Sequence, residues 1–226
     1  MMKIDILTLF PLMFDGFLKE SIIKRAIEKE IVTINIHDFR KYSTNLHHKV
    51  DDTPYGGGQG MVLSCQPIFD CIEDIKTSDS YVILLTPDSK DVFNQKKAYE
   101  LSKFKHIIFI CGHYEGFDDR IRSLADLELS IGDFILTGGE LPSMIITDAI
   151  VRLLPGVIKE ESHLLESFQN DLLDYPVYTK PQVYKGMEVP SVLLSGDHKK
   201  IEEYRNKMRI ERTKERRPDL LNNKGK

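Results

Sequence analysis

Three glycine-rich segments could bring the backbone close to a ligand, because glycine adopts conformations that are closed to other residues. The first is DDTPYGGGQGM at 51–61, which follows the basic patch HHK at 47–49. It is not a P-loop, because no Gly-Lys-Ser/Thr follows, and it is not a dinucleotide-binding fingerprint, because it does not join a strand directly to a helix. A ligand-contacting loop and a plain flexible loop both remain open for this segment.

The other two glycine segments follow or lie close to expected strand ends. They are CGHYEGFD at 111–118 and SIGDFILTGGELP at 130–142. Ligands of open α/β sheets bind at the carboxyl ends of the strands. Together with the turn at 85–87, these loops could therefore converge on one cofactor, although each could also be a structural turn.

The sequence offers little support for a metal site or for covalent catalysis. Cys111 and His113 are separated by one residue, and His47 and His48 are adjacent, neither of which is a usual zinc-ligand spacing. No Gly-x-Ser-x-Gly elbow is present. We therefore expect no dedicated metal ion and no nucleophilic side chain.

Composition is that of a soluble globular protein, with 226 residues, 41% of them hydrophobic and 29% charged. No apolar run approaches the roughly 20 residues that span a bilayer, and the opening residues do not resemble a signal peptide, so we expect a cytoplasmic protein. The three cysteines show no CxxC spacing. They are expected to be reduced, mostly buried thiols.

Positive charge is concentrated at the end of the chain. The formal net charge is −4, yet residues 199–226 carry eleven Lys and Arg against five Asp and Glu. Such a segment can neutralise phosphates, which is the term that typically dominates nucleic-acid affinity. A solvated charged helix is the alternative.

The apolar pattern alternates between strands and helices, which predicts an α/β fold. The runs at 81–86 and 106–111 are almost uninterrupted, as expected for parallel strands that are covered on both faces. The remaining expected strands are 3–10 and 31–39, and the expected helices are 11–29, 66–76, 94–101, 141–153 and 199–213.

The periodicity weakens after Pro155 and Gly156, and three prolines punctuate residues 176–190. This predicts an α/β domain over 1–158, a flexible linker over 159–174 and a small helical domain over 175–226.

Taken together, the segments resemble the bacterial tRNA (guanine-N1)-methyltransferase family of the SPOUT superfamily, in order and over nearly the whole chain. The residues that carry the resemblance are LFP with MF at 9–14, VDDTPYGGG with GM at 50–61, CG with YEG at 111–116, SIGD at 130–133, GGELP at 138–142, PGV at 155–157, GMEVP at 186–190, VLLSG at 192–196, and RT with RRP at 212–218.

The resemblance implies an N-terminal domain with a parallel sheet and a deep trefoil knot, a small helical C-terminal domain, and a homodimer. It also implies that three knot loops hold S-adenosyl-L-methionine. Matched motif by motif, the cofactor-binding residues are Leu85, Thr86, Pro87, Gly112, Tyr114, Glu115, Ile131, Gly132, Asp133, Phe134, Ile135, Leu136, Gly138, Gly139 and Pro142. This chain has Pro87-Asp88-Ser89 where the family often has Pro-Gln-Gly.

Methylation of guanine N1 requires removal of a proton, so a carboxylate should act as general base and a cation should stabilise charge that develops on O6. The resemblance assigns the cation to Arg152. The base is an Asp of an Asp-Ser-Phe motif in the family, whereas this chain has Glu166-Ser167-Phe168. Glu166 is therefore the candidate base, with Asp171 and Asp174 as alternatives.

On the substrate side, the implied partner is tRNA, methylated at guanosine 37 next to the anticodon so that the reading frame is maintained. The basic residues would contact its phosphates and Asp51 would help to read the base. Magnesium is a possible assisting ion. A ribose methyltransferase of the same superfamily and a non-catalytic RNA-binding protein are the alternatives. The substrate-binding candidates are Lys49, Asp51, Arg209, Arg212, Lys214, Arg216 and Arg217.

Overall fold

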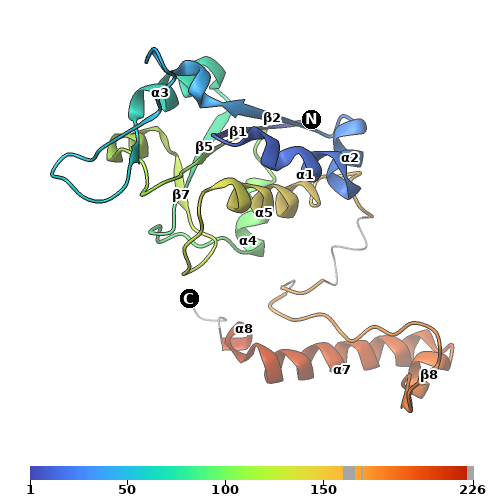
Figure 1. The fold of residues 1–226 in the computed structure, drawn as a ribbon. Coiled ribbons are helices and arrows are strands. Elements are labelled where there is room, and N and C mark those ends of the chain that lie inside the picture. Colours follow the sequence, from blue (N-terminus) through green and yellow to red (C-terminus); the bar gives the residue numbers. More distant parts are fainter. Residues whose placement is uncertain (160–165, 169, 223–226) are drawn as a thin grey trace. The chain divides into compact units, whose positions relative to one another are not determined.

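The computed structural model describes residues 1–159, 166–168 and 170–222. The chain divides into two compact units, Met1–Ile158 and Lys159–Lys226. Figure 1 shows the sheet and its helices in the first unit and a long helix in the second. None of the described helices is both long and apolar enough to cross a membrane.

The first unit is built on a five-stranded sheet in the order β2-β1-β6-β5-β7, and every strand pairs in parallel with its neighbours. This confirms the expected α/β class. The three-residue strand β7 was not predicted, because it is too short to show a pattern of its own. The strands are β1 Met2–Thr8, β2 Val32–Asp38, β5 Ser80–Leu85, β6 His106–Cys111 and β7 Leu127–Leu129.

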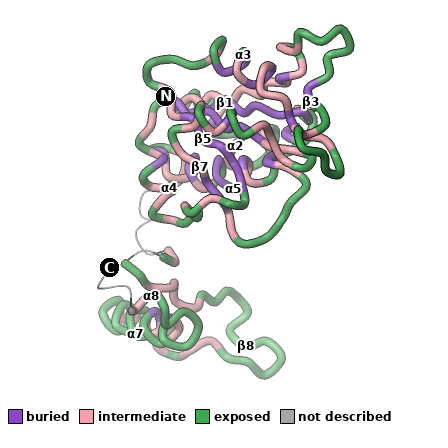
Figure 2. The backbone as a smooth tube through the Cα atoms, turned by 90° about the vertical axis from the view of Figure 1, so that its left-hand side faces the viewer, coloured by how far each residue is buried: buried purple, intermediate pink, exposed green. Residues whose placement is uncertain are grey.

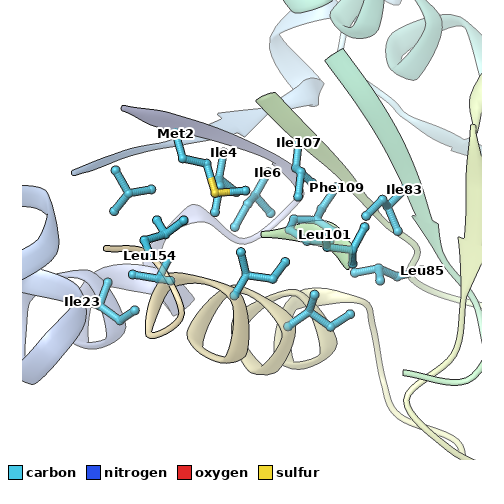
Figure 3. Close-up of a cluster of buried hydrophobic side chains, with 14 of the residues drawn as sticks. Met2, Ile4, Ile6, Ile23, Ile83, Leu85, Leu101, Ile107, Phe109 and Leu154 are labelled. Carbon is cyan, nitrogen blue, oxygen red and sulfur yellow. The ribbon is translucent and has the colours of Figure 1, made fainter. Parts of the chain in front are cut away.

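Side chains alternate between the two faces of the sheet, and each face has its own apolar core. In β6, Ile107 and Phe109 belong to the core on one face, whereas Ile108 and Ile110 belong to the core on the other. Burying such a side chain contributes about 1.5–3 kcal/mol. Figure 3 shows the first core, where residues from β1, β5 and β6 meet Ile23 and Leu154.

Helices cover both faces of the sheet. Residues of α2 (Ser21–Glu28), α4 (Gln95–Leu101) and α5 (Glu140–Val151) enter the first core, and residues of α3 (Cys65–Ile75) enter the second. The helices expected at 66–76, 94–101 and 141–153 are confirmed. Figure 2 shows that burial is concentrated in the strands and in the inner faces of these helices.

The single helix expected over 11–29 is wrong. The structure has a 3-10 helix η1 (Pro11–Phe14), α1 (Asp15–Lys19) and α2, with extended backbone at Glu20 and a φ of 55° at Ser21. At 100° per residue, an uninterrupted helix would place Ile23 roughly 180° around the axis from Phe14. Both side chains are buried in the same core, so the break rotates the second apolar stripe toward the sheet.

Shorter elements complete the first unit. The 3-10 helices are η2 (Phe39–Tyr42) and η3 (Asp119–Leu124). The strands β3 (Asp51–Asp52) and β4 (Val62–Leu63) pair antiparallel, so the glycine-rich residues 53–61 form the loop of a β-hairpin.

In the second unit, Leu173 and Tyr175 contact the long helix α7 (His198–Arg216), and Phe168 contacts Arg217 at its end. The Leu173 amide donates to the Thr213 hydroxyl at 2.8 Å, and that hydroxyl donates to the Arg209 carbonyl oxygen at 2.7 Å. The other elements of this unit are β8 (Val183–Tyr184), β9 (Met187–Glu188), η4 (Ser191–Leu194) and α8 (Pro218–Asn222).

All three cysteines are free, and Cys71 and Cys111 are buried while Cys65 is half-buried. Burial raises the pKa of Cys71 to about 12, and burial together with the nearby Glu140 carboxylate raises the pKa of Cys111 well above its usual value. The expectation that the thiols are mostly buried is confirmed.

Candidate active site

The carboxyl ends of β5, β6 and β7 meet at one edge of the sheet, and the loops that follow them surround a cavity of about 480 Å³. Fourteen of the fifteen residues predicted to bind the cofactor line this cavity, and Asp133 is the exception. That the residues bind the cofactor stays a prediction, but the structure brings them together. The cavity is also lined by Val62, Asp88, His113, Gly116, Phe117, Arg122, Leu129, Ser130 and Thr137.

Two glycines allow the loop before α5 to lie directly against the end of β6. The Gly139 amide donates to the Gly112 carbonyl oxygen at 2.9 Å. A Cβ added at Gly139 would lie 2.7 Å from Cα of Cys111, and one at Gly138 would lie 2.6 Å from Nδ1 of His113. A larger residue at Gly139 would require movement of the backbone, and one at Gly138 would require the neighbouring side chains to shift, so both glycines favour the close packing of the two loops.

The hairpin β3–β4 is joined to the wall of the same cavity. The Glu115 amide donates to the Met61 carbonyl oxygen at 3.1 Å, and the Leu63 amide donates to that of Gly116 at 3.0 Å. A Cβ at Gly60 would lie 2.3 Å from Cγ of Glu115. The glycine-rich loop is therefore anchored beside the cavity, and it leaves the Tyr55 side chain fully exposed.

A buried carboxylate lies where three segments meet. Glu140 is 2% exposed and accepts a hydrogen bond of 2.7 Å from the Thr8 hydroxyl, at the end of β1. Nδ1 of His113 lies 4.0 Å from Oε2 of Glu140 and has no hydrogen-bond partner among the described residues. The imidazole ring is held between Phe10 and Tyr114, with centroids at 4.7 and 5.0 Å. Glu140 thus ties the ends of β1 and the start of α5 together beneath the cavity.

Two other acids on the cavity wall differ in their surroundings. Asp88 accepts hydrogen bonds from Thr86 and from Arg122, the latter at 2.7 Å. Glu115, in contrast, forms no side-chain hydrogen bond or ion pair with another residue that the structure describes. The cavity therefore carries one carboxylate whose charge is balanced and one whose charge is not.

Sequence reasoning missed Asp88, His113 and Arg122 as cavity residues. His113 lies inside the CGHYEG motif and could have been found from its neighbours. Arg122 lies in η3 and reaches the cavity only because that helix folds back against the loop after β5, which no local pattern could indicate.

The two predicted catalytic residues lie in different units. Arg152 caps the carboxyl end of α5 in the first unit, and Glu166 is a half-buried residue of the second. The α5 helix begins at the cavity with Glu140, next to Gly139, and ends near the start of β2, where Lys29 donates to the Gly156 carbonyl oxygen at 3.4 Å. The structure therefore does not bring Arg152 to the cavity of its own chain. The alternative bases, Asp171 and Asp174, are exposed and half-buried.

The predicted substrate-binding residues fall into two groups. Lys49 and Asp51 lie at the base of the β3–β4 hairpin, where Nζ of Lys49 is 3.6 Å from the Asp52 carboxylate. The C-terminal group lies on and after α7, where Lys214 and Arg216 are exposed and Arg212 is half-buried.

Two arginines of the C-terminal group make contacts within their own unit. Arg209 is 5% exposed, and its Nε donates to the Leu173 carbonyl oxygen at 3.4 Å. Arg217 forms a two-point ion pair with Asp219 at 2.7 and 2.9 Å. Arg209 is thus a packing residue of this unit, and its guanidinium is not presented at the surface.

Among the described residues, no group of three or more His, Cys, Asp or Glu side chains is arranged to hold a metal ion.

Comparison with known proteins gives the family directly. Residues 2–223 match the family model described as tRNA (Guanine-1)-methyltransferase TrmD. The chain belongs to this family. Curated relatives named tRNA (guanine-N(1)-)-methyltransferase include those of Bacillus subtilis strain 168, 57% identical over 224 residues, and Macrococcus caseolyticus, 60% identical over 222 residues. Each alignment covers 97% of this chain and 92% of the relative.

A third relative of the same name, from Mycoplasmopsis agalactiae, is 55% identical over 221 residues, which is 97% of either chain. The family resemblance expected from the motifs is confirmed over the length that they cover.

Proposed function

We propose that the protein transfers the methyl group of S-adenosyl-L-methionine to N1 of guanosine 37, the base on the 3′ side of the anticodon of tRNA, and so maintains the reading frame. The observation that carries the proposal is the cavity at the carboxyl ends of β5, β6 and β7, which is lined by the residues that match the family's donor-binding motifs.

The residues present fit this donor. A cavity of about 480 Å³ is within the range of roughly 300–1,000 Å³ that small-molecule sites occupy. Gly112, Gly138 and Gly139 have no side chains to fill the cavity, so an adenine ring can approach the main chain of its wall closely. The unbalanced Glu115 carboxylate suits the positive charge of a sulfonium or an ammonium group. The donor supplies a methyl group that is already activated as a sulfonium, so no covalent help from a side chain is needed.

The remaining chemical task of the protein is to remove the proton from guanine N1. Glu166 removes this proton as general base, and the Arg152 guanidinium stabilises the negative charge that develops on O6. Glutamate is one methylene longer than the family's aspartate but has a similar pKa in its unperturbed state. Glutamate can therefore act as the base in place of aspartate, provided that the surrounding chain adjusts to its greater length.

The position of Arg152 supports a homodimer. The twelve residues of α5 span about 18 Å, and Arg152 lies at the end remote from Pro142 and the cavity. An arginine that acts on a guanine at the cavity mouth must then come from a second copy of the chain. We therefore propose that each site combines the cavity of one subunit with Arg152 of its partner.

The RNA is held by the basic residues of the second unit and by the hairpin beside the cavity. Arg212, Lys214 and Arg216 contact phosphates, with Arg217 beside them, while Lys49 and Asp51 lie near the base that enters the site. The burial of Arg209 gives it the task of supporting α7 rather than of contacting RNA.

The finer features of the fold belong to the same proposal. A trefoil knot is supported by the path of α5, which follows the edge strand β7 and yet packs beneath β1 and β6. We also propose the family's division into a donor-binding domain over 1–158, a linker over 159–174 and an RNA-binding domain over 175–226, acting in the cytoplasm. Magnesium stays a prediction without an assigned ligand.

The test is methylation of an unmodified tRNA transcript by the full-length protein, followed by digestion and mass analysis of the nucleosides. We expect N1-methylguanosine from a transcript with G37 and no product when position 37 is adenosine. A ribose-methylated nucleoside would instead indicate a ribose methyltransferase. RNA binding without turnover would indicate a non-catalytic protein.

The shared site has its own test. Arg152→Ala and Glu115→Lys should each be inactive alone, because one lacks the arginine and the other places a cation against the donor. After subunit exchange, half of the dimers are mixed and each contains one intact site, so activity should return to about a quarter of wild type. No recovery after verified exchange would mean that Arg152 acts in its own chain.

A further inference from the structure

The loop after β5 fixes a carboxylate, Asp88, in the wall of the cavity. The Thr86 hydroxyl donates to one of its oxygens, and Nη2 of Arg122 donates to the other at 2.7 Å. The loop itself is held against β7, because the Thr86 amide donates to the Leu129 carbonyl oxygen at 3.1 Å and the Ser89 hydroxyl to that of Glu128 at 2.8 Å. The carboxylate is therefore held in one position by contacts within the protein.

Arg122 is in turn held by other acids. Its Nε donates to Asp119 at 2.8 Å, and its Nη1 donates to the Glu128 carboxylate. The Thr86 hydrogen bond and the Arg122 guanidinium lower the pKa of Asp88, so this group is ionised at neutral pH. Its charge is balanced in place, whereas that of Glu115 is not.

Because of this difference, the two acids suit different groups of the donor. S-adenosyl-L-methionine has a sulfonium and an ammonium group, which carry positive charge, and a ribose with two neutral hydroxyls. The unbalanced Glu115 carboxylate attracts the charged groups. A carboxylate that is already balanced by a guanidinium has less to offer a second cation, but its oxygens keep lone pairs that accept hydrogen bonds from hydroxyls.

We propose that the Asp88 carboxylate accepts hydrogen bonds from the ribose hydroxyls of the methyl donor. Carboxylates perform this task in other nucleotide sites at the carboxyl ends of parallel strands. Because an ionised carboxylate can only accept, it recognises a hydroxyl and gains nothing from a ribose that lacks one. Asp88 is then a determinant of ribose recognition, and Thr86 and Arg122 are the residues that position it. This inference rests on the proposed function.

The experiment uses calorimetry with three ligands: S-adenosylhomocysteine and its forms that lack the 2′- or the 3′-hydroxyl. Wild-type protein should bind at least one deoxy form about tenfold more weakly than the parent, the scale of one hydrogen bond to a charged group at a partly exposed site. Asp88→Ala should bind all three ligands with the same affinity, close to that of wild type for the weaker deoxy form. Equal binding of all three ligands by wild type would overturn the proposal, as would discrimination that survives in Asp88→Ala.

A matched control is Asp119→Asn. Asp119 is a second partner of Arg122, but it does not line the cavity, so this variant should keep the discrimination of wild type. Asp88→Asn provides a second substitution of nearly the same shape, and thermal melting verifies that each variant is folded. If wild type bound none of the three ligands, the proposed function itself would fail, whereas equal binding of all three would remove only the role of Asp88.

Discussion

Thr8 and Glu140, which are 132 residues apart in the sequence, are joined by a buried hydrogen bond of 2.7 Å between hydroxyl and carboxylate. This contact links the end of strand β1 to the first turn of α5, and the same carboxylate lies 4.0 Å from Nδ1 of His113. It fixes the helix whose N-terminal residues form one wall of the cavity.

Replacement of Thr8 by Val removes the hydroxyl and leaves a buried carboxylate oxygen without its donor. The free energy of unfolding should fall by about 1.5–3 kcal/mol, the scale for a hydrogen bond to a charged group. Urea denaturation measures the change. Thr8→Ser, which keeps the hydroxyl, should lose clearly less, and equal losses in the two variants would show that packing of the methyl group dominates.

Gly139→Ala should damage the donor site, because its Cβ would lie 2.7 Å from Cα of Cys111. Relief of that clash requires backbone movement and typically costs about 1–3 kcal/mol. The matched control is Gly16→Ala in α1, where nothing lies within 4 Å of the added Cβ; it should be neutral or stabilise by roughly 0.5–1 kcal/mol. Donor affinity and melting temperature, measured on both variants, test the prediction, and equal behaviour of the two would contradict it.

Glu166→Gln should lower turnover at least about 100-fold with little change in donor affinity, because the amide cannot accept the N1 proton. Single-turnover methylation and donor titration separate the two effects. The variants Asp171→Asn and Asp174→Asn should stay near wild type. A large loss of turnover in one of these two variants, with normal turnover of Glu166→Gln, would show that the substituted aspartate is the base.

Asp5 makes stability depend on pH. Burial by itself would raise the pKa of this carboxyl, but hydrogen bonds with His37, Lys3, Asn35 and His106 outweigh it and hold the pKa well below its ordinary value. A depressed pKa in the folded state stabilises the protein above the unfolded-state pKa of about 3.9, and this stabilisation is lost as the pH falls toward the folded-state pKa.

Asp5→Asn should therefore be destabilising at pH 7, and its difference from wild type should shrink below about pH 4. Chemical denaturation at a series of pH values gives the comparison. Asp15→Asn removes an exposed partner of Lys19 and should have little effect at any pH. A difference for Asp5→Asn that stayed constant to pH 2 would refute the assignment.

Much of the first unit could be predicted because its strands are buried on both faces. The runs at 81–86 and 106–111 are apolar except at Thr86 and His106, so they could be recognised as strands without knowledge of their distant contacts. The break at Ser21 could not be predicted in this way. It is needed because the apolar side chains around Phe14 and those around Ile23 must both face the sheet, and the sequence does not show where the sheet lies. The strand β7 forms through its pairing with β5. A segment of three residues is too short to show a strand pattern in the sequence.

The candidate site shows the same division. Its glycine loops were found because glycine after a strand indicates a loop where a ligand can approach the backbone. Asp88 and Arg122 were missed because their importance comes from a contact between residues 34 positions apart. Arg152 was found by resemblance, yet only the direction of α5 indicates that it lies away from the cavity of its own chain.

The burial of two of the three cysteines has a practical consequence. Cys71 and Cys111 lie in the cores on opposite faces of the sheet, whereas Cys65 begins α3 and is half-buried. A thiol-reactive fluorophore should therefore attach at one site per chain without engineered substitutions. Because α3 follows directly on the β3–β4 hairpin, emission from a dye at Cys65 could report the arrival of RNA at that hairpin in real time.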